Sequence, residues 1–349
     1  MKPATSIPVG ILGASGYTGA ELVRLLDLHP NVDIQLLTAD RKAGLGIEQV
    51  FPHLGGTDLP DLTKIEDADF SGLNTVFLGL PHGTTQDVVA KLPDHLRVID
   101  LSADFRLSDH ATYAKWYGHD HRAPDLQKDA IYAIPELNRD AIKAARIIAN
   151  PGCYPTASLL PLVPLLESGL IEADDIIIDA KSGVSGAGRG AKEETLFTEV
   201  SGGINAYGVG HHRHVSEIEQ ELSLASKGDV TVTFTPHLVP MNRGILATIY
   251  VRLSGKTTAK DLRENLCAKY SSEPFVRVVP EGMTPSTRHV RGSNHCLMGV
   301  FEDRIKGRAI IVSVIDNLVK GAAGQAVQNF NLISGLPEIT ALQQHPLFP

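Results

Sequence analysis

Short hydrophobic runs, separated by stretches of helical or loop character, organise the first 150 residues of the chain. Apolar runs of this length are typical of buried strands when polar residues, glycine or proline flank them. Between the runs, segments 20–26 and 86–90 place their apolar residues on one helical face. We expect strands at 8–12, 32–37, 75–80, 97–101 and 146–150. This alternation of strands and helices predicts a Rossmann-type parallel sheet.

The pattern changes in the second half of the chain, where β-branched runs are separated by longer helical or loop stretches. These runs lie at 175–180, 230–235, 245–251 and 309–314, and segment 316–334 has helical character. They predict a mixed sheet with helices. We therefore expect an α/β chain with a Rossmann domain at 1–150, to which segment 317–349 returns, and a second domain of the α+β class at 151–316.

Composition restricts the class of protein without identifying it. Of the 349 residues 43% are hydrophobic, and no run approaches the roughly 20 apolar residues that a membrane span needs. The net charge of -8 supplies no basic field for nucleic acid. Three scattered cysteines argue against disulfides and against a zinc site. Since the start shows no signal-peptide pattern, we expect a cytoplasmic enzyme that binds neither membrane nor nucleic acid.

A glycine-rich loop follows the first predicted strand and precedes a helix. Backbone amides of such a loop approach a pyrophosphate, which the helix N-terminus then stabilises. The spacing is GxxGxxG rather than the commoner GxGxxG, and a simple tight turn is the alternative interpretation. The expected contacts of a dinucleotide are Gly13, Ser15, Gly16, Tyr17, Thr18 and Gly19.

The end of the second strand is where such domains distinguish NAD from NADP. An acidic residue there binds the ribose 2′-hydroxyl of NAD, whereas an arginine accommodates the 2′-phosphate of NADP. Here Thr38 occupies the strand end, Asp40 comes slightly late, and Arg41 and Lys42 add positive charge. We expect NADP, with Thr38 and Arg41 as contacts; the alternative is that Arg41 and Lys42 are solvated loop charges.

Cys153 lies in the proline-flanked segment NPGCYPT at 150–156, just before an apolar stretch. At a helix N-terminus the unpaired amides and the dipole stabilise a thiolate over a thiol, which produces a reactive nucleophile. A structural turn cysteine is the alternative. Cys267 and Cys296 are closer to packing cysteines, which sit inside apolar periodic segments.

Residues 207–217 concentrate three histidines, an arginine and a carboxylate before a predicted helix. A general acid or base is one interpretation, since histidine titrates near neutrality. A metal site and a cluster without function at a helix N-terminus are the others, and the sequence offers no clear set of metal ligands.

Three further segments carry candidate contacts. The loop 182–189 offers an amide-rich nest for phosphate or cofactor, or is a flexible surface loop. Arg106, in the segment 102–106, is placed either to hold an anion or to form a structural ion pair. Asn317 follows the last strand, where it can cap a helix and contact a nicotinamide carboxamide.

Together these motifs resemble the N-acetyl-γ-glutamyl-phosphate reductase family, in its shorter, single-function form, over almost the whole chain. That family is related more distantly to aspartate-semialdehyde dehydrogenase and glyceraldehyde-3-phosphate dehydrogenase. The motifs are GASGYTG at 13–19, SADFR at 102–106, NPGCYPT at 150–156, SGVSGAGR at 182–189, GHHRH at 210–214 and DNLVKGAAGQAVQN at 316–329.

The resemblance implies a glyceraldehyde-3-phosphate-dehydrogenase-like fold, an NADP domain, and dimer contacts in the second domain, with a homodimer or homotetramer expected. It implies Cys153 as nucleophile and an acid/base histidine at His212 or His214, of which we expect His212; His211 receives no role. The remaining expected contacts are Arg106, His214, Glu217 and Ser185 for substrate, and Ser182, Gly183 and Asn317 for cofactor.

The implied reaction is the NADPH-dependent reduction of N-acetyl-γ-glutamyl phosphate, through a Cys153 thioester, to N-acetylglutamate semialdehyde in arginine biosynthesis. A reductase of carrier-protein-linked aminoadipyl or glutamyl phosphate in lysine biosynthesis shares nearly every motif, but an acidic carrier needs basic surface and this chain carries -8. Aspartate-semialdehyde dehydrogenase uses the same chemistry with a different nucleophile motif. A non-catalytic dinucleotide-binding sensor is the alternative from another class.

Overall fold

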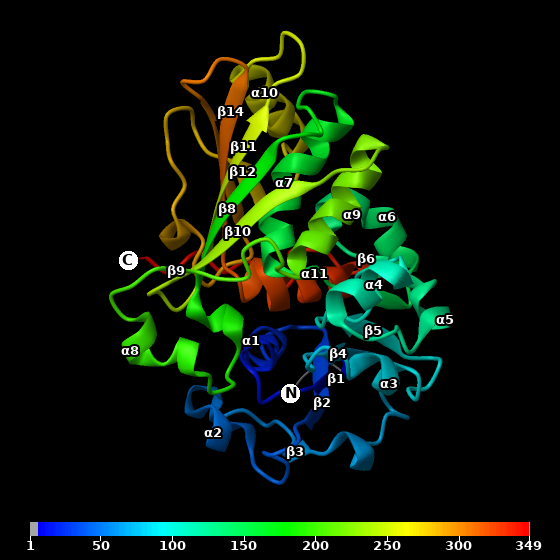
Figure 1. Ribbon diagram of the computed structural model, residues 1–349. Coiled ribbons are helices and arrows are strands. Elements are labelled where there is room, and N and C mark those ends of the chain that lie inside the picture. Colours follow the sequence, from blue (N-terminus) through cyan, green and yellow to red (C-terminus); the bar gives the residue numbers. More distant parts are fainter. Residues whose placement is uncertain (1–5, 349) are drawn as a thin grey trace. The chain divides into compact units, whose positions relative to one another are not determined.

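The computed structural model describes residues 6–348, and the chain divides into two compact units (Figure 1). The first unit comprises the chain up to Pro151 together with Ala322–Gln343. The second comprises Gly152–Gly321 together with the residues from Gln344 onward. The chain thus changes unit after residues 151 and 321, against the predicted 150 and 316. The residues from Gln344 onward were predicted in the first domain and lie in the second unit instead.

A seven-stranded parallel sheet with the order β3-β2-β1-β4-β5-β7-β6 forms the first unit. Its strands are β1 Ile7–Leu12, β2 Val32–Thr38, β3 Leu62–Thr63, β4 Thr75–Leu78, β5 Arg97–Asp100, β6 Ala130–Tyr132 and β7 Ile147–Ala149. The five predicted strands are all present. β3 and β6, of two and three residues, were not predicted because so short a run carries no readable periodicity.

Helices connect these strands and bury the sheet, as parallel strands require. The helices are α1 Tyr17–Leu26, α2 Ile47–Val50, α3 Thr85–Val89, α4 His110–Tyr117, α5 Pro124–Gln127, α6 Pro135–Ala144 and α11 Gly324–Ile333, with 3-10 turns at Pro52–Leu54 and Ile65–Asp67. The C-terminal helix α11 packs against α1 and α6. The predicted return of the chain to the first domain is therefore made by α11.

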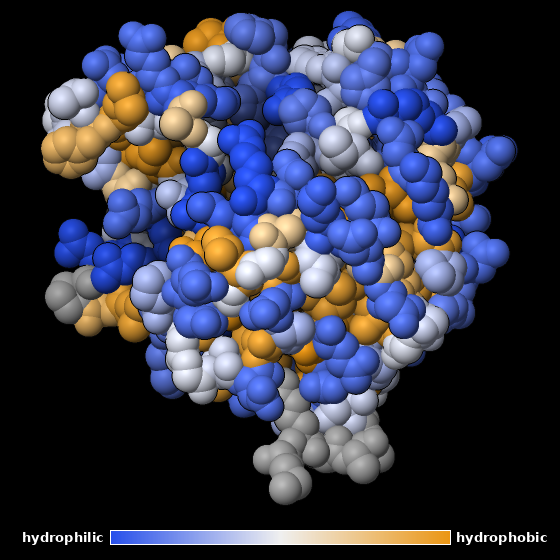
Figure 2. Space-filling view, turned by 90° about the horizontal axis from the view of Figure 1, so that it is seen from below, coloured by the Kyte–Doolittle hydropathy of each residue, from blue (hydrophilic) through white to orange (hydrophobic). Residues whose placement is uncertain are grey.

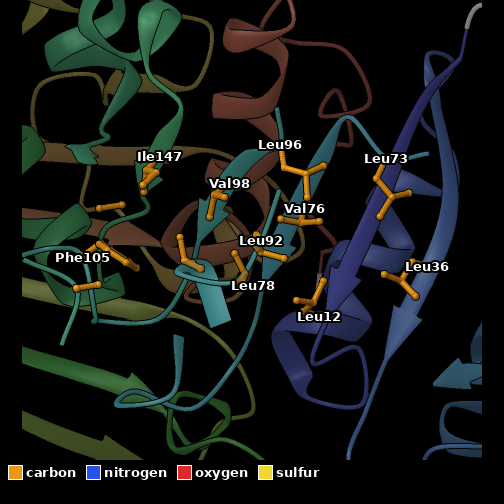
Figure 3. Close-up of a cluster of buried hydrophobic side chains, with 13 residues drawn as sticks. Leu12, Leu36, Leu73, Val76, Leu78, Leu92, Leu96, Val98, Phe105 and Ile147 are labelled. Atoms are coloured by element: carbon orange, nitrogen blue, oxygen red, sulfur yellow. The ribbon is translucent and has the colours of Figure 1, made fainter. Parts of the chain in front are cut away.

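Residues from neighbouring strands and the segments that follow them form one hydrophobic core of this unit (Figure 3). Leu12 of β1, Val76 and Leu78 of β4, and Val98 of β5 are fully buried, and Phe105 packs at the end of β5. Burial of a side chain of this size contributes roughly 1.5–3 kcal/mol relative to exposure. This core fixes the strand ends from which the functional loops leave.

The second unit contains a mixed seven-stranded sheet with the order β12-β13-β14-β11-β8-β10-β9. Its strands are β8 Ile176–Gly183, β9 Asn205–Ala206, β10 Val232–Val239, β11 Ile245–Arg252, β12 Val276–Val278, β13 Cys296–Glu302 and β14 Arg308–Ile315. β8 pairs with β10 in parallel and with β11 in antiparallel orientation. The predicted mixed sheet is confirmed, and the four predicted strands are its central ones.

Helices pack against this sheet, and α7 contacts β11, β14, α9 and α10. They are α7 Cys153–Glu167, α8 Phe197–Val200, α9 His214–Ser226 and α10 Ala259–Lys269, with 3-10 turns at Val184–Ala187, Glu193–Thr195 and Thr287–His289 and a π-helix at Val319–Ala323. α7 is buried on nearly all sides, which explains its uniformly apolar sequence.

Figure 2 shows one face of the molecule on which hydrophilic residues predominate and hydrophobic residues form small groups among them. Within residues 6–348, no helix combines the length and the apolar character that a membrane span requires.

Candidate active site

The glycine loop between β1 and α1 has the geometry of a phosphate cradle. Gly13 has a φ of +83°, and a Cβ there would lie 2.6 Å from the carbonyl oxygen of Gly79. A Cβ at Gly19 would lie 2.5 Å from the oxygen of Gly13, so only glycine permits this close packing. Gly16, the N-cap of α1, provides no side-chain hydrogen bond to the helix. β1 pairs with β2 on one side and β4 on the other, so the loop lies where strand order reverses, the usual place for a dinucleotide.

Thr38 ends β2, as expected, but its side chain turns inward. Its side chain is fully buried, and its hydroxyl oxygen accepts a hydrogen bond of 3.2 Å from the Gly13 N–H. Its carbonyl oxygen accepts another, of 2.8 Å, from the Ala14 N–H. Thr38 therefore shapes the glycine loop and does not present a group to a 2′-phosphate. Arg41 and Lys42, beyond the end of β2, are exposed.

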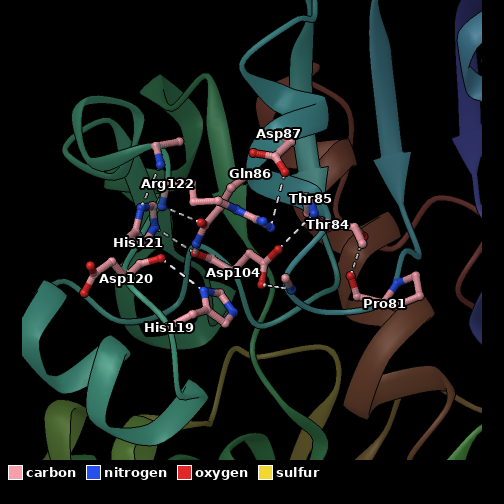
Figure 4. Close-up of polar contacts among 12 residues, drawn as sticks. Pro81, Thr84, Thr85, Gln86, Asp87, Asp104, His119, Asp120, His121 and Arg122 are labelled. Atoms are coloured by element: carbon pink, nitrogen blue, oxygen red, sulfur yellow. Dashed lines mark hydrogen bonds and ion pairs between the residues drawn. The ribbon is translucent and has the colours of Figure 1, made fainter.

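The segment after β5 is organised by the buried carboxylate of Asp104 (Figure 4). That carboxylate accepts hydrogen bonds from Gly83 N–H (2.7 Å), Thr85 N–H (2.9 Å) and the Tyr113 hydroxyl (3.2 Å). The Gln86 side-chain amide donates to the Asp104 carbonyl oxygen. The motif at 102–106 thus holds the loop after β4 in place, a role that sequence reasoning missed because its partners lie far along the chain.

Arg106 is 7% exposed and its guanidinium is bound to backbone. Its Nε–H donates to the Asn150 carbonyl oxygen and its Nη2 donates to that of Leu101, each at 2.9 Å. The arginine therefore ties the end of β5 to the segment that follows β7. Two of its donors are thereby engaged by backbone carbonyl oxygens. The predicted role of Arg106 as an anion contact depends on its remaining N–H groups and stays a prediction.

Cys153 is the first residue of α7. Its N-cap, Gly152, accepts the Thr156 N–H at 3.0 Å, and no side chain of the N-cap covers the helix end. The thiol is partly exposed. A Cβ at Gly321 would lie 2.7 Å from the Cys153 Cβ, so this glycine leaves the room that the cysteine occupies. The position at the helix N-terminus favours a thiolate.

Glu217, on the first turn of α9, reaches back to the cysteine segment. Its side chain is fully buried, and its Oε2 accepts a hydrogen bond of 3.0 Å from the Gly152 N–H. Its Oε1 lies 3.8 Å from Nε2 of His214. Because the carboxylate has no exposed surface, Glu217 does not fit the predicted role of a substrate contact.

His214 lies against the backbone that precedes the nucleophile. A Cβ at Gly152 would lie 2.5 Å from Nε2 of His214, so the imidazole occupies the space that glycine leaves. The side chain of His214 is 19% exposed, in contrast to that of Glu217 beside it. His214 is therefore accessible from solvent and lies against the residue that precedes Cys153.

His212 lies within a group of rings. Ring centroids of Tyr154, Tyr207 and Phe234 are 5.6, 5.4 and 5.4 Å from its own, and that of His214 is 4.9 Å away. Burial, reinforced by the positive field of His214, lowers the pKa of His212 to about 3. Its Nδ1 accepts the backbone N–H of His214 at 3.2 Å. A histidine that stays neutral at pH 7 is a poor proton donor, so the expectation that His212 is the acid does not fit this environment.

Two tyrosines beside these histidines were not predicted as part of the site. The hydroxyls of Tyr154 and Tyr207 are 2.9 Å apart. Burial raises the pKa of Tyr207 to about 12 and that of Tyr154 further, so both are protonated at neutral pH. Tyr154 follows the nucleophile directly in the sequence, and Tyr207 begins the segment that contains the histidines. Their closeness in sequence to these residues could have identified both tyrosines as part of the site.

The first amides of the loop 182–189 are engaged in hydrogen bonds, so an amide nest in this loop stays a prediction for the residues after Ser185. The Gly183, Val184 and Ser185 N–H groups donate to the carbonyl oxygens of Gly244, Met241 and Asn242. Ser182 is buried, and its hydroxyl donates to the carbonyl oxygen of Gly183. These engaged amides are unsuited to phosphate, because a nest requires several N–H groups that point at the anion.

Asn317 is 2% exposed and its amide is bound on both sides. Its Oδ1 accepts the Gly244 N–H at 2.7 Å, and its Nδ2 donates to the Ser185 hydroxyl at 3.0 Å. The predicted cap role belongs to Asp316, whose Oδ1 accepts the Leu318 and Val319 N–H groups. Asn317 thus joins two loops of the second unit, and its contact with a nicotinamide stays a prediction.

The histidine cluster has no geometry for a metal. Within residues 6–348, no group of three or more His, Cys, Asp and Glu side chains is arranged to hold a metal ion. His211 is exposed, and its Nδ1 lies 2.9 Å from the Val209 carbonyl oxygen.

Comparison with known proteins relates both halves of the chain to dehydrogenases. A family model described as the NAD binding domain of semialdehyde dehydrogenase matches residues 8–145. A second model, described as the dimerisation domain of semialdehyde dehydrogenase, matches residues 153–317.

Individual relatives are similar over nearly the whole of this chain. N-acetyl-gamma-glutamyl-phosphate reductase of Rhodospirillum rubrum is 60% identical over 348 residues, which cover 98% of this chain and 99% of that protein. The probable chloroplastic N-acetyl-gamma-glutamyl-phosphate reductase of Arabidopsis thaliana is 58% identical, covering 100% of this chain and 87% of that protein.

Solved structures share the fold at low identity. Aspartate semialdehyde dehydrogenase II of Vibrio cholerae, complexed with ASA, has a TM-score of 0.72 and 19% identity, and covers 95% of this chain and 99% of its own. The Candida albicans aspartate semialdehyde dehydrogenase with NADP has a TM-score of 0.68 and 19% identity, and covers 94% and 98%. The predicted fold class is thereby confirmed.

Proposed function

Because the chain belongs to the N-acetyl-gamma-glutamyl-phosphate reductase family, we propose that it reduces N-acetyl-γ-glutamyl phosphate to N-acetylglutamate semialdehyde and phosphate. The observation that carries the proposal is Cys153, partly exposed at the N-terminus of α7 with His214 against the residue before it. The reaction is a step of arginine biosynthesis and takes place in the cytoplasm. The protein acts as a homodimer or homotetramer, for which a match to a dimerisation-domain model is the support.

Cys153 acts as the nucleophile. Its thiolate attacks the acyl carbon, the bond from that carbon to the phosphate oxygen breaks, and phosphate leaves with the proton that the reduction consumes. A thioester on Cys153 remains. The positive end of the helix dipole at the start of α7 lies beside Cys153 and can stabilise the oxyanion that develops next to the sulfur.

NADPH is the proposed reductant, and when bound it supplies the hydride that converts the thioester to a hemithioacetal. The glycine cradle of Gly13, Gly16 and Gly19 fits a pyrophosphate, since a Cβ at Gly13 or Gly19 would occupy the space of the loop backbone. The remaining contacts proposed from the loop are Ser15, Tyr17 and Thr18. The exposed Arg41 is the proposed partner of the 2′-phosphate, supported by its place beyond the end of β2.

We assign the proton transfer to His214 and not to His212. His214 lies against Gly152, whereas His212 is enclosed by rings and its pKa is lowered to about 3. His214 donates a proton to the oxyanion of the hemithioacetal and takes it back as the carbon–sulfur bond breaks, which restores the thiolate and releases the aldehyde. Arg106 and Ser185 are the remaining proposed substrate contacts.

The proposal is tested by NADP⁺ reduction in the reverse direction. N-acetylglutamate semialdehyde with phosphate is expected to support turnover, with a kcat/KM well above that of aspartate semialdehyde and with NADP⁺ preferred over NAD⁺. A carrier-protein-linked aminoadipate semialdehyde serves as the competing substrate. Preference for that substrate establishes the lysine-pathway alternative, and no turnover with any of the three establishes a non-catalytic role.

A further inference from the structure

We infer that Glu217 is the positioning residue of this site: through one oxygen it holds the segment that presents Cys153, and through the other it keeps His214 protonated and in place. The inference rests on the proposed function for its catalytic meaning. Its structural content, an ion pair between Glu217 and His214, is independent of the substrate. Neither the hydrogen bond to Gly152 nor the ion pair with His214 was expected, because the sequence indicated Glu217 as a substrate contact.

The first link runs from α9 to the N-terminus of α7. Glu217 Oε2 accepts the Gly152 N–H at 3.0 Å, across a separation of 65 residues, and both groups are buried. Gly152 is the N-cap of α7, so its amide lies one residue before the nucleophile. A charged acceptor makes a stronger hydrogen bond than a neutral one, and losing it leaves a buried N–H without a partner. The carboxylate thus fixes where the helix begins.

The second link runs along α9 itself. Glu217 is three residues after His214, a spacing that places both side chains on one face of a helix. Glu217 Oε1 lies 3.8 Å from Nε2 of His214. The same Nε2 would be 2.5 Å from a Cβ at Gly152, so the imidazole is held between the carboxylate and the cysteine segment. One carboxylate therefore contacts both the nucleophile segment and the proton donor.

Glu217 supplies a buried negative charge beside His214, and the surrounding groups differ in charge. His212 is neutral near pH 7 because burial lowers its pKa to about 3. Tyr154 and Tyr207 are protonated because burial raises their pKa values, and Phe234 of β10 adds an uncharged ring. The other ionisable groups on the packed elements are Cys153 and Glu167 on α7, Glu219 and Glu221 on α9, His211 and Arg213 just before α9, and His237 on β10.

Glu221 provides a natural control because it is one turn further along α9. Burial raises the pKa of Glu221 to about 7, and its Oε1 accepts a hydrogen bond from the side chain of Gln220. The hydrogen bond to Gly152 and the ion pair with His214 are both made by Glu217. A change at Glu221 alters a buried carboxyl of the same helix without removing either of these contacts.

The direction of the expected effect follows from charge. A nearby carboxylate stabilises the imidazolium form of His214, so replacing Glu217 with glutamine lets His214 lose its proton at lower pH. In the assay of semialdehyde oxidation, His214 must be neutral to accept a proton. We expect the kcat of the wild type to fall at acidic pH as His214 becomes protonated, and we expect this acidic limb to be absent in His214→Asn. In Glu217→Gln the same limb is expected to move to lower pH.

The experiment compares Glu217→Gln, Glu217→Ala and Glu221→Gln with the wild type. Glu217→Gln keeps an oxygen that accepts the Gly152 N–H, so we expect the limb to move by about one pH unit or more while kcat at its plateau falls less than tenfold. Glu217→Ala loses both links, and we expect roughly a hundredfold loss of kcat. Glu221→Gln is expected to leave the limb unchanged. The inference is overturned if the acidic limb of the kcat profile does not move in Glu217→Gln. It is also overturned if the limb moves by the same amount in Glu221→Gln.

A second measurement needs neither a variant of Glu217 nor turnover. In wild-type protein labelled with ¹³C in its histidine rings, we expect His214 to titrate at higher pH than His212, each resonance being identified from its asparagine variant. Titration of His214 at or below that of His212 overturns the inference even if no Glu217 variant folds. Since this measurement involves no substrate, it separates a failure of the ion pair from a failure of the proposed function.

Discussion

Cys153, Cys267 and Cys296 differ in their surroundings, and the difference decides which thiol can act. Cys296 is buried in β13, with its Sγ 3.5 Å from the Ser313 hydroxyl. Cys267 was expected to be a packing cysteine but is exposed on α10. Its exposure makes Cys267 a target for alkylating reagents at high pH. Selective modification of Cys153 therefore requires lower pH, where a helix N-terminus keeps a thiolate populated and a surface thiol is protonated.

The two candidate histidines are distinguished by substitution. His214→Asn is expected to lower kcat by roughly 10²-fold or more with a smaller change in KM, because a proton donor acts mainly in the transition state. His212→Asn is expected to lower kcat by less than about tenfold, since His212 contributes packing and one acceptor to the His214 N–H. Steady-state kinetics in both directions measure the difference. The reverse order of effects assigns the proton transfer to His212, and His211→Asn serves as the unaffected control.

Single residues were the least predictable part of the site. The motifs identify Cys153 and the histidine cluster as candidates, because residue type and context in the sequence suffice for that. They give no sign that Glu217 reaches Gly152, nor that Thr38 turns inward to the Gly13 N–H. Such contacts depend on the packing of elements that are distant in sequence. For that reason Asn317, which can cap a helix, forms a link between two loops instead.

At the scale of elements, the β1–α1 loop depends on glycine for its shape. A Cβ at Gly19 would lie 2.5 Å from the Gly13 oxygen and 2.6 Å from the Ala14 Cα. Gly19→Ala is therefore expected to displace the loop and raise the KM for NADPH at least tenfold, with a smaller effect on kcat. Gly72→Ala is the control, since a Cβ there would meet no atom closer than 3.9 Å. Equal KM values for NADPH in the two variants contradict the assignment of the loop to the cofactor.

The elements themselves were largely predictable. β1, β2, β4 and β5 lie in the short apolar runs of the sequence, and the helix that begins at Cys153 was expected from the apolar stretch after it. β12 and β13 were missed, and in β13 the small residue Gly299 and the polar Glu302 interrupt the apolar run. Strand pairing also depends on partners far along the chain, so the order of strands in the mixed sheet was not available from periodicity alone.

For the whole molecule, the buried His212 couples stability to pH. The pKa of His212 is about 3 in the folded protein, against 6.5 for an unperturbed histidine. Between these two pH values the imidazole is protonated in the unfolded chain and neutral in the folded protein. Stability therefore falls as pH is lowered through this window. Between pH 7 and pH 5 we expect His212→Asn to lose less stability than the wild type, by on the order of 2 kcal/mol. Urea unfolding followed by circular dichroism measures this, with the exposed His211→Asn as control; parallel losses in all three proteins contradict it.

The chemistry proposed for the molecule depends on a covalent intermediate at Cys153, and one measurement tests that most directly. Without phosphate, the enzyme mixed with NADP⁺ and N-acetylglutamate semialdehyde is expected to form NADPH in a burst of one equivalent per active site, because the thioester then has no acceptor. Mass spectrometry should find the acyl group on the peptide that contains Cys153, and added phosphate should remove it. Cys153→Ser should show neither burst nor adduct while still binding NADP⁺. A burst in Cys153→Ser, or an acyl group on any other residue, contradicts the assignment of Cys153 as the nucleophile.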